Sequence, residues 1–183
     1  MRLFVAIDLD GGIKEKIRVM EQEMIKKDVD VKFVEPKNLH LTLKFLGEVG
    51  EGKIGQIEEK IEKVLKGSGP FDIAIEGFGY FGKPSYIRTL WFDLTKGKER
   101  VAELIERLNI ALDYVRHEGR PVTTHITIGR VKSGKKREIL LKEAERLRNV
   151  KIGEVIVKEV KLKESILTKK GPIYRDVKVF KLG

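Results

Sequence analysis

The stretch "NLHLTLKFLG" (Asn38–Gly47) sets the frame for the whole chain, because apolar and polar residues alternate along it. Such alternation predicts a β-strand with one buried face. The buried face is expected to hold Leu39, Leu41, Leu43 and Phe45, and the polar face Asn38, His40, Thr42 and Lys44. Since side chains two residues apart on a strand point the same way, His40 and Thr42 would lie together, with Cα atoms about 6.5 to 7 Å apart.

The stretch "TTHITIGR" (Thr123–Arg130) repeats the His-x-Thr arrangement in the second half of the chain. His125 and Thr127 would again share a polar face, with the isoleucines beside them turned to the core. The chain has only three histidines, and the third, His117 in "RHEGRP", lies outside any strand pattern, so we expect it at the surface. A single histidine on a half-buried strand is usually structural, but recurrence in a matched strand indicates function.

The order of strands and helices also recurs along the chain. Apolar residues at helical spacing predict helices over residues 11–27, 51–66, 97–115 and 135–149, with strand patterns between them. The sequence offset that carries His40 onto His125 also carries the first strand and the first helix onto matching elements. We infer a duplicated β-α-β-α-β unit, approximately residues 1–84 and 85–183.

Two features predict how these units are assembled. No linker rich in Ser, Pro or Gly separates the halves, which indicates a single two-lobed domain over residues 1–183. Strand patterns follow one another directly over residues 71–94 and 153–180, which favours antiparallel pairing and an α+β fold. If the halves are related by a pseudo-two-fold axis, the two His-x-Thr pairs face each other across a groove.

The composition describes a globular chain. Of its 183 residues, 41% are hydrophobic and 36% are charged, and no apolar run is long enough to cross a membrane. The first residues, "MRLFVAIDLDGG", become acidic too early for a signal peptide, so we expect a cytoplasmic protein. The absence of cysteine excludes disulfides, thiolate metal sites and cysteine nucleophiles. Few Asn and Gln beside many Lys and Glu are typical of thermophiles.

The net charge of +10 points to a polyanionic partner such as RNA or DNA. A lysine-rich thermophilic surface explains the same charge equally well. The basic segment Lys132–Arg137 directly follows the second motif, so we expect RNA to contact it.

Two imidazoles on opposite sides of one substrate provide the proton transfers that phosphodiester cleavage needs without a metal. A neutral ring takes a proton from the attacking oxygen while a protonated ring gives one to the leaving oxygen, and a pKa of about 6.5 allows both forms near neutrality. Thr42, Thr127 and Arg130 would bind the non-bridging oxygens. Strict alternation would turn Arg130 away from His125, so this role requires Gly129 to bend or end the strand.

Other kinds of site fit the sequence less well. A zinc site needs three or four ligands, usually with two close in sequence, and the chain has no His-x-His or His-x-x-x-His pair. It also has no glycine-framed serine elbow, no P-loop and no GxGxxG motif. We therefore expect neither a metal nor a cofactor.

In their order and spacing, the segments "MRLFVAIDL", "HLTLKFLG" and "HITIGR" resemble the 2H phosphoesterase superfamily. They are most similar to its bacterial and archaeal RNA 2′,3′-cyclic phosphodiesterases, also called 2′-5′ RNA ligases. The resemblance extends as far as "GPIYRDV". It implies a bilobal fold with helices outside and the active site in the groove between lobes. It further implies His40 and His125 as the catalytic pair, with His40 as acid and His125 as base, and Thr42 and Thr127 as phosphate ligands.

The chain departs from that family's pattern at two places. Thr124 precedes the second histidine where proline is common, and Ile128-Gly129 follows the second threonine where Leu-Ala is common. Neither departure touches a residue with a catalytic role.

We therefore expect a monomeric, metal-independent enzyme that opens the 2′,3′-cyclic phosphate at an RNA end to a 2′-phosphate. With a 5′-hydroxyl in place of water, the same groups would form a 2′-5′ linkage. The alternative is a non-catalytic RNA- or nucleotide-binding module, which would keep the basic groove but would not need both histidines.

Overall fold

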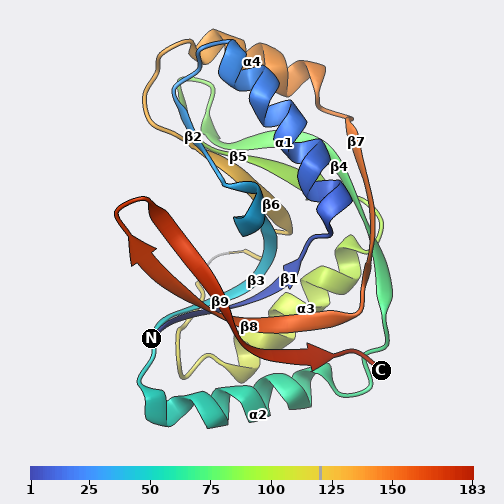
Figure 1. The fold of residues 1–183 in the computed structure, drawn as a ribbon. Coiled ribbons are helices and arrows are strands. Elements are labelled where there is room, and N and C mark those ends of the chain that lie inside the picture. Colours follow the sequence, from blue (N-terminus) through green and yellow to red (C-terminus); the bar gives the residue numbers. More distant parts are fainter. Residues whose placement is uncertain (120) are drawn as a thin grey trace.

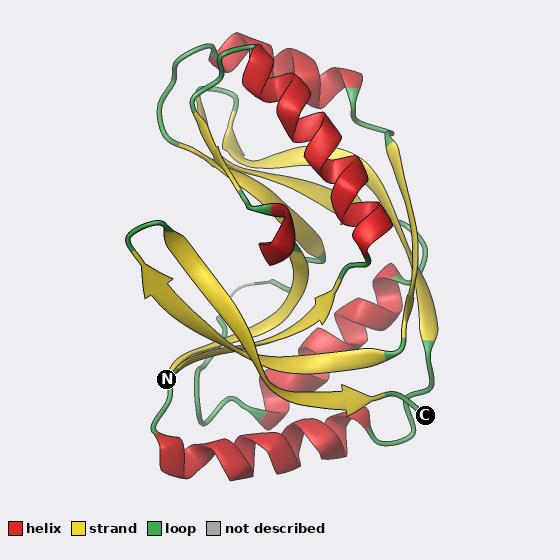
Figure 2. Ribbon diagram, viewed as in Figure 1, coloured by secondary structure: helices red, strands yellow, loops and turns green. Residues whose placement is uncertain are grey.

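The computed structural model describes residues 1–119 and 121–183 and contains two antiparallel sheets (Figures 1 and 2). The four-stranded sheet has the order β3 (His40–Glu48), β1 (Arg2–Asp8), β8 (Glu159–Thr168), β9 (Gly171–Lys181). The five-stranded sheet has the order β2 (Val31–Phe33), β6 (His125–Val131), β5 (Tyr86–Leu94), β4 (Phe71–Lys83), β7 (Lys151–Val157). The predicted α+β class with two lobes is confirmed.

The helices cover the outer faces of the sheets (Figure 1). They are α1 (Gly11–Lys26), α2 (Ile54–Leu65), α3 (Lys98–Ala111) and α4 (Arg137–Arg146), with short 3₁₀ turns at Pro36–Asn38 and Glu51–Lys53. Helix α1 packs on β7 and α4 on β4, whereas α2 packs on β9 and α3 on β3. Helix α3 ends at Ala111, whereas the sequence predicted a helix as far as Val115. None of the helices in residues 1–119 and 121–183 is long and apolar enough to cross a membrane.

Each sheet combines strands from both ends of the chain. Strand β1 pairs with β3 on one side and with β8 on the other, so the C-terminal hairpin β8–β9 completes the N-terminal sheet. Strands β4 and β5 pair with each other across the turn at Pro84 and Ser85, where the inferred repeat divides. The two lobes are therefore not the two halves of the sequence, and the duplication stays a prediction.

Strand β3 carries a bulge that the alternating pattern did not predict. Its pairing with β1 shifts by one residue at Leu43, so Leu43 and Lys44 are both buried. Phe45, expected in the core, is instead 53% exposed. The ammonium group of Lys44 tolerates burial because it donates to Oδ1 of Asn109 at 2.9 Å and to the carbonyl of Arg116 at 3.0 Å.

Strand β6 carries the same bulge at the matching position of the second motif, Ile128. Ile128 and Gly129 are both buried, and Arg130 is exposed. A Cβ at Gly129 would lie 2.7 Å from Cγ1 of Val31, so the close approach of β2 requires a glycine here. The extra residue returns Arg130 to the face of the sheet that carries His125, as its predicted role demands.

Candidate active site

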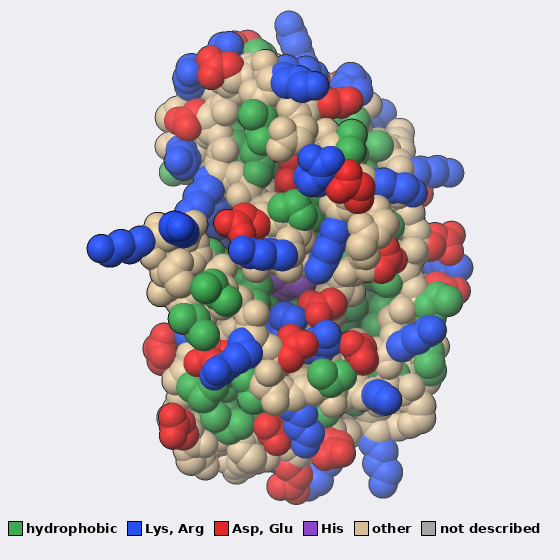
Figure 3. Space-filling view, in the orientation of Figure 1, with side chains coloured by type: hydrophobic (Ala, Val, Ile, Leu, Met, Phe, Trp, Pro, Cys, Tyr) green, Lys and Arg blue, Asp and Glu red, His purple; other side chains and the backbone are tan. Residues whose placement is uncertain are grey.

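The two His-x-Thr motifs are brought together by strands of different sheets. Strand β3 at the edge of the four-stranded sheet lies against β6 of the five-stranded sheet. The space-filling view shows a hollow in the middle of this face, with histidine atoms at its base and Lys and Arg side chains on its rim (Figure 3). The two motif strands are therefore in contact, and histidine atoms lie at the base of a hollow in this face.

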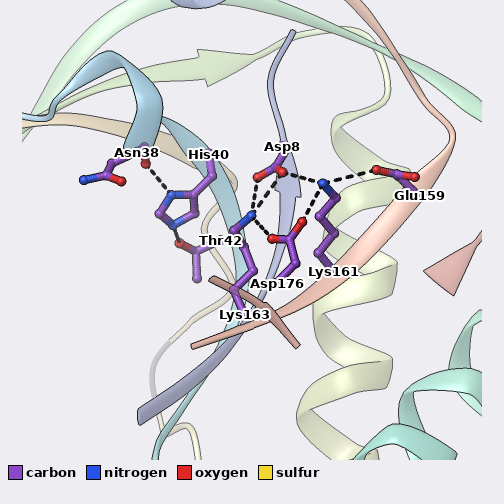
Figure 4. Close-up of polar contacts among 8 residues, drawn as sticks. All are labelled: Asp8, Asn38, His40, Thr42, Glu159, Lys161, Lys163 and Asp176. Carbon is purple, nitrogen blue, oxygen red and sulfur yellow. Dashed lines mark hydrogen bonds and ion pairs between the residues drawn. The ribbon is translucent and has the colours of Figure 1, made fainter. Parts of the chain in front are cut away.

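The ring of His40 is held at both nitrogens (Figure 4). Nδ1 lies 2.7 Å from the backbone carbonyl of Asn38, and Nε2 lies 2.9 Å from Oγ1 of Thr42. A carbonyl can only accept, so Nδ1 carries the proton and donates to Asn38. In the neutral ring, Nε2 is then unprotonated and accepts from the Thr42 hydroxyl. This tautomer leaves Nε2 as the nitrogen that exchanges protons.

Aromatic side chains fix the plane of the His40 ring. Phe4 lies 5.0 Å away between ring centroids, and Tyr174 approaches edge-on at 5.3 Å and 88°. Burial lowers the pKa of His40, while the Asn38 carbonyl and the charge of Asp8 oppose this fall. The ring is therefore neutral more readily than a histidine in water.

The ring of His125 is held more loosely. Phe81 approaches it edge-on at 4.8 Å and 88°, but Nδ1 has no hydrogen-bond partner among the residues that the structure describes. Burial lowers the pKa of His125, and the Thr123 carbonyl and the charge of Asp93 raise it. The Thr123 carbonyl stands two residues before His125, as the Asn38 carbonyl stands two residues before His40.

The sequence reasoning missed two aspartates beside the histidines. Asp8 is the cross-strand partner of His40, and Asp93 is the cross-strand partner of His125. These aspartates, in "AIDL" and "WFDL", are separated by the same sequence offset as the two histidines. Applying that offset to every polar residue of the repeat would have identified both aspartates.

Lysines bind both aspartates. Nζ of Lys163 contacts Asp8 at 3.0 Å and Asp176 at 2.6 Å, and Lys161 contacts Asp8 at 2.9 Å (Figure 4). Burial alone would raise the pKa of Asp8, but the two lysines hold it below its usual value. Lys98 binds Asp93 at 2.7 Å. Both carboxylates are therefore fixed in place by ion pairs.

The charge of Arg130 influences one residue of the four-stranded sheet. Burial raises the pKa of the Tyr174 hydroxyl, and the charge of Arg130 opposes this rise. Tyr174 contacts the His40 ring, so the charge of Arg130 influences a neighbour of the first motif. On its own strand, Arg130 lies on the face that carries His125. Its catalytic role, and those of the histidines and threonines, stay predictions.

A cavity of about 380 Å³ opens beside His125. Phe81 and Trp91 form its aromatic side, and the first turn of α3 and residues 122–124 form the rest. A Cβ at Gly79 would lie 2.6 Å from the Trp91 ring, so this glycine lets the indole lie flat on β4. The volume is in the range of small-ligand sites, roughly 300 to 1,000 Å³.

The remaining candidates lie outside the groove or are engaged elsewhere. His117 is exposed, as predicted, and its Nδ1 contacts Asp113 at 2.7 Å. In the basic segment, Lys135 and Lys136 both form ion pairs with Asp28, at 3.0 and 3.2 Å. Two of its charges are thus partly neutralised. Residues 1–119 and 121–183 contain no group of three or more His, Asp or Glu side chains placed to hold a metal ion.

Comparison with known proteins places the chain in a family. It matches the family "LigT like Phosphoesterase" over residues 7–91 and 93–174. It is 42% identical to an RNA 2′,3′-cyclic phosphodiesterase of Methanothermobacter thermautotrophicus, over 100% of this chain and 99% of the relative. It is 40% identical to the protein of that name from Archaeoglobus fulgidus, over 98% and 99% of the two chains.

Solved structures share the fold. The protein TT0787 of Thermus thermophilus superposes with a TM-score of 0.82 at 28% identity, over 100% of this chain and 98% of that one. E. coli LigT, at 23% identity, gives a TM-score of 0.78 over 99% and 97% of the two chains and shows likeness of fold alone. The chain therefore belongs to the LigT-like phosphoesterases of the 2H phosphoesterase superfamily.

Proposed function

We propose that the protein is a phosphodiesterase that hydrolyses the 2′,3′-cyclic phosphate at an RNA end. Full-length relatives at 42% and 40% identity are named for this activity. The observation that carries the proposal is the pair of His-x-Thr motifs on two contacting strands, with Nδ1 of His40 turned to the Asn38 carbonyl. That arrangement offers two imidazole rings to one substrate.

The proposed reaction uses one histidine as base and the other as acid. The base takes a proton from water as the water oxygen attacks phosphorus, and the acid protonates the 3′ oxygen as its bond to phosphorus breaks. The product carries a 2′-phosphate and a free 3′-hydroxyl. Following the family resemblance, we assign His40 as acid and His125 as base.

The phosphate oxygens would be bound by three groups. The hydroxyls of Thr42 and Thr127 and the guanidinium of Arg130 lie on the groove side of their strands. Each can donate to a non-bridging oxygen, where negative charge grows in the transition state. The cavity beside His125 would leave room for the nucleoside that carries the phosphate. We propose that these side chains suffice and that no metal takes part.

With a 5′-hydroxyl in place of water, the same proton transfers would join two RNA ends through a 2′-5′ linkage. Ligation is therefore part of the proposal. We also propose that the protein acts on RNA as a monomer in the cytoplasm. Its basic charge and the names of its relatives support RNA as the substrate.

The test is a defined RNA that ends in a 2′,3′-cyclic phosphate. The expected product is the 2′-phosphate, identified by chromatography against both phosphate isomers. The same RNA ending in a linear 3′-phosphate is the control and should stay unchanged. Tight binding of the cyclic end without turnover would refute hydrolysis and favour a binding module, and a 3′-phosphate product would refute the assigned leaving group.

A further inference from the structure

The two histidines have matching surroundings that the proposed proton transfers do not by themselves require. Asp8 on β1 faces His40, and Asp93 on β5 faces His125, in each case as the directly opposed residue of the neighbouring strand. Opposed side chains of an antiparallel pair lie on one face, with Cβ atoms about 4.5 to 5.5 Å apart. Each carboxylate is therefore close to one imidazole.

A purely structural aspartate would need only its lysine. Lys163, 7% exposed, binds Asp8 and Asp176 together and ties β1 to β8 and β9. That role explains Asp8 but not its counterpart. Asp93 binds the half-exposed Lys98 of α3, from a different element and in a different geometry. What the two aspartates have in common is the histidine opposite.

The charged groups around each ring are few. The groups around His40 are Asp8 of β1, Lys163 of β8, Lys14 of α1 and the ring of Tyr174 of β9. Of these groups, Asp8 is the only carboxylate.

His125 is surrounded by Asp93 of β5, with Lys98 and Glu99 of α3 lining the same cavity. On its own strand, Arg130 lies on the same face. Asp93 raises the pKa of His125, as Asp8 raises that of His40.

We propose that Asp8 and Asp93 are positioning residues of the reaction, each holding a negative charge beside one histidine so that the ring can carry a proton in the groove. The inference rests on the proposed function. For the acid, the charge maintains the protonated form before the reaction. For the base, it stabilises the imidazolium that forms in the transition state.

The variants Asp8→Asn and Asp93→Asn test this, since each removes a charge and keeps the side-chain shape. The pKa values of the rings are read by NMR titration, and three histidines give three signals. Asp8→Asn should lower the pKa of His40, and Asp93→Asn that of His125. The exposed His117 should stay unmoved in both variants and is the internal control.

Two matched variants separate charge from structure. Asp176→Asn removes a carboxylate that binds the same two lysines as Asp8 but is not paired with His40 across the strands. The pKa of His40 should therefore fall less than in Asp8→Asn. Lys98→Met removes the cation that partly neutralises Asp93, so the pKa of His125 should rise, opposite in sign to Asp93→Asn. A structural role predicts no such reversal.

Activity gives the second readout. Each Asp→Asn variant should lose on the order of 10-fold in kcat/KM toward a 2′,3′-cyclic nucleotide, carried by kcat. One limb of the pH profile should move to lower pH: the alkaline limb if the affected ring is the acid, the acid limb if it is the base. The two variants should move different limbs, which identifies the acid and the base.

The outcomes are distinguishable. A wild-type protein that opens no cyclic phosphate refutes the proposed function, whereas the NMR titration still reports on the aspartates. The inference is overturned if the His40 and His125 signals keep their pKa values in folded Asp→Asn variants. Equal shifts from Asp8→Asn and Asp176→Asn would also overturn it, since the effect would then be the general charge of the ion-pair network.

Discussion

The substitutions His40→Ala and His125→Ala test the two-histidine mechanism most directly, and the structure predicts a different cost for each. A proton-transfer group contributes roughly 10² to 10⁴ in rate, so each variant should lose at least that factor in kcat. Because the two rings act on one reaction, the double variant should lose less than the product of the single losses.

The effects on folding should be unequal. His40 has two aromatic contacts, each worth about 0.5 to 1.5 kcal/mol, and a hydrogen bond to Asn38 worth about as much. His40→Ala should therefore cost about 1.5 to 4.5 kcal/mol of unfolding free energy. His125 has one edge contact with Phe81 and no partner for Nδ1 among the described residues, so His125→Ala should cost about 1 kcal/mol.

The assay pairs initial rates on a 2′,3′-cyclic mononucleotide with thermal unfolding of the same preparations. Rates are measured well below the lowest unfolding transition, so that loss of fold does not count as loss of catalysis. A near wild-type rate in either folded variant would refute the acid-base pair. If the variant with the larger loss of unfolding free energy also has the larger loss of rate, and both losses are explained by unfolding, the motifs only support the fold.

Three further outcomes follow from the site. Thr42→Ala and Thr127→Ala should each lower kcat/KM on the order of 10- to 100-fold, since each removes a donor to a phosphate oxygen and no proton carrier. The pH profile of Thr127→Ala should stay unchanged, and a profile shifted in pH would contradict that role. Cyclic-phosphate opening should survive excess EDTA, and a loss that a divalent ion restores would contradict a metal-free mechanism. Replacing the three lysines of Lys132–Arg137 with alanine should lower the salt dependence of long-RNA binding and spare a cyclic mononucleotide, and an unchanged salt slope would make this segment ordinary surface.

The sequence was most informative where side-chain type and strand period coincide. The alternation around His40 and His125 was enough to predict two strands on which each histidine shares a face with the following threonine. Strand patterns that follow one another with no helix between them were enough to predict antiparallel pairing. These features depend on neighbours within a few residues, so a single sequence records them.

The sequence was misleading where the strand itself is irregular. Periodicity placed Phe45 in the core, whereas the bulge at Leu43 exposes it and buries Lys44. Nothing local marks this bulge, because the acceptors for Lys44 come from Asn109 and Arg116, far along the chain. At Arg130 the glycine before it was a local sign, and the bend it allowed is present.

Contacts between segments that are distant in the chain could not be predicted from the sequence. Tyr174 against His40, and Lys163 between Asp8 and Asp176, depend on β8 and β9 joining the sheet of β1. Polar residues on a predicted strand give no sign of which strand will lie beside them. The pairing of aspartate with histidine could have been inferred only from the internal repeat.

Each sheet combines strands from both ends of the chain, and this affects when the protein becomes active during synthesis. Strand β1 is made first, yet its partner β8 begins at Glu159, and the β8–β9 hairpin ends only at Lys181. The contact of Tyr174 with His40 and the ion pairs of Lys161 and Lys163 with Asp8 cannot form until that hairpin has left the ribosome. Such distant pairing also slows folding, because a long loop must close before its contacts are gained. A nascent chain that already contains both His-x-Thr motifs therefore lacks the support of its first histidine, so activity should appear only after the hairpin has emerged and joined the sheet.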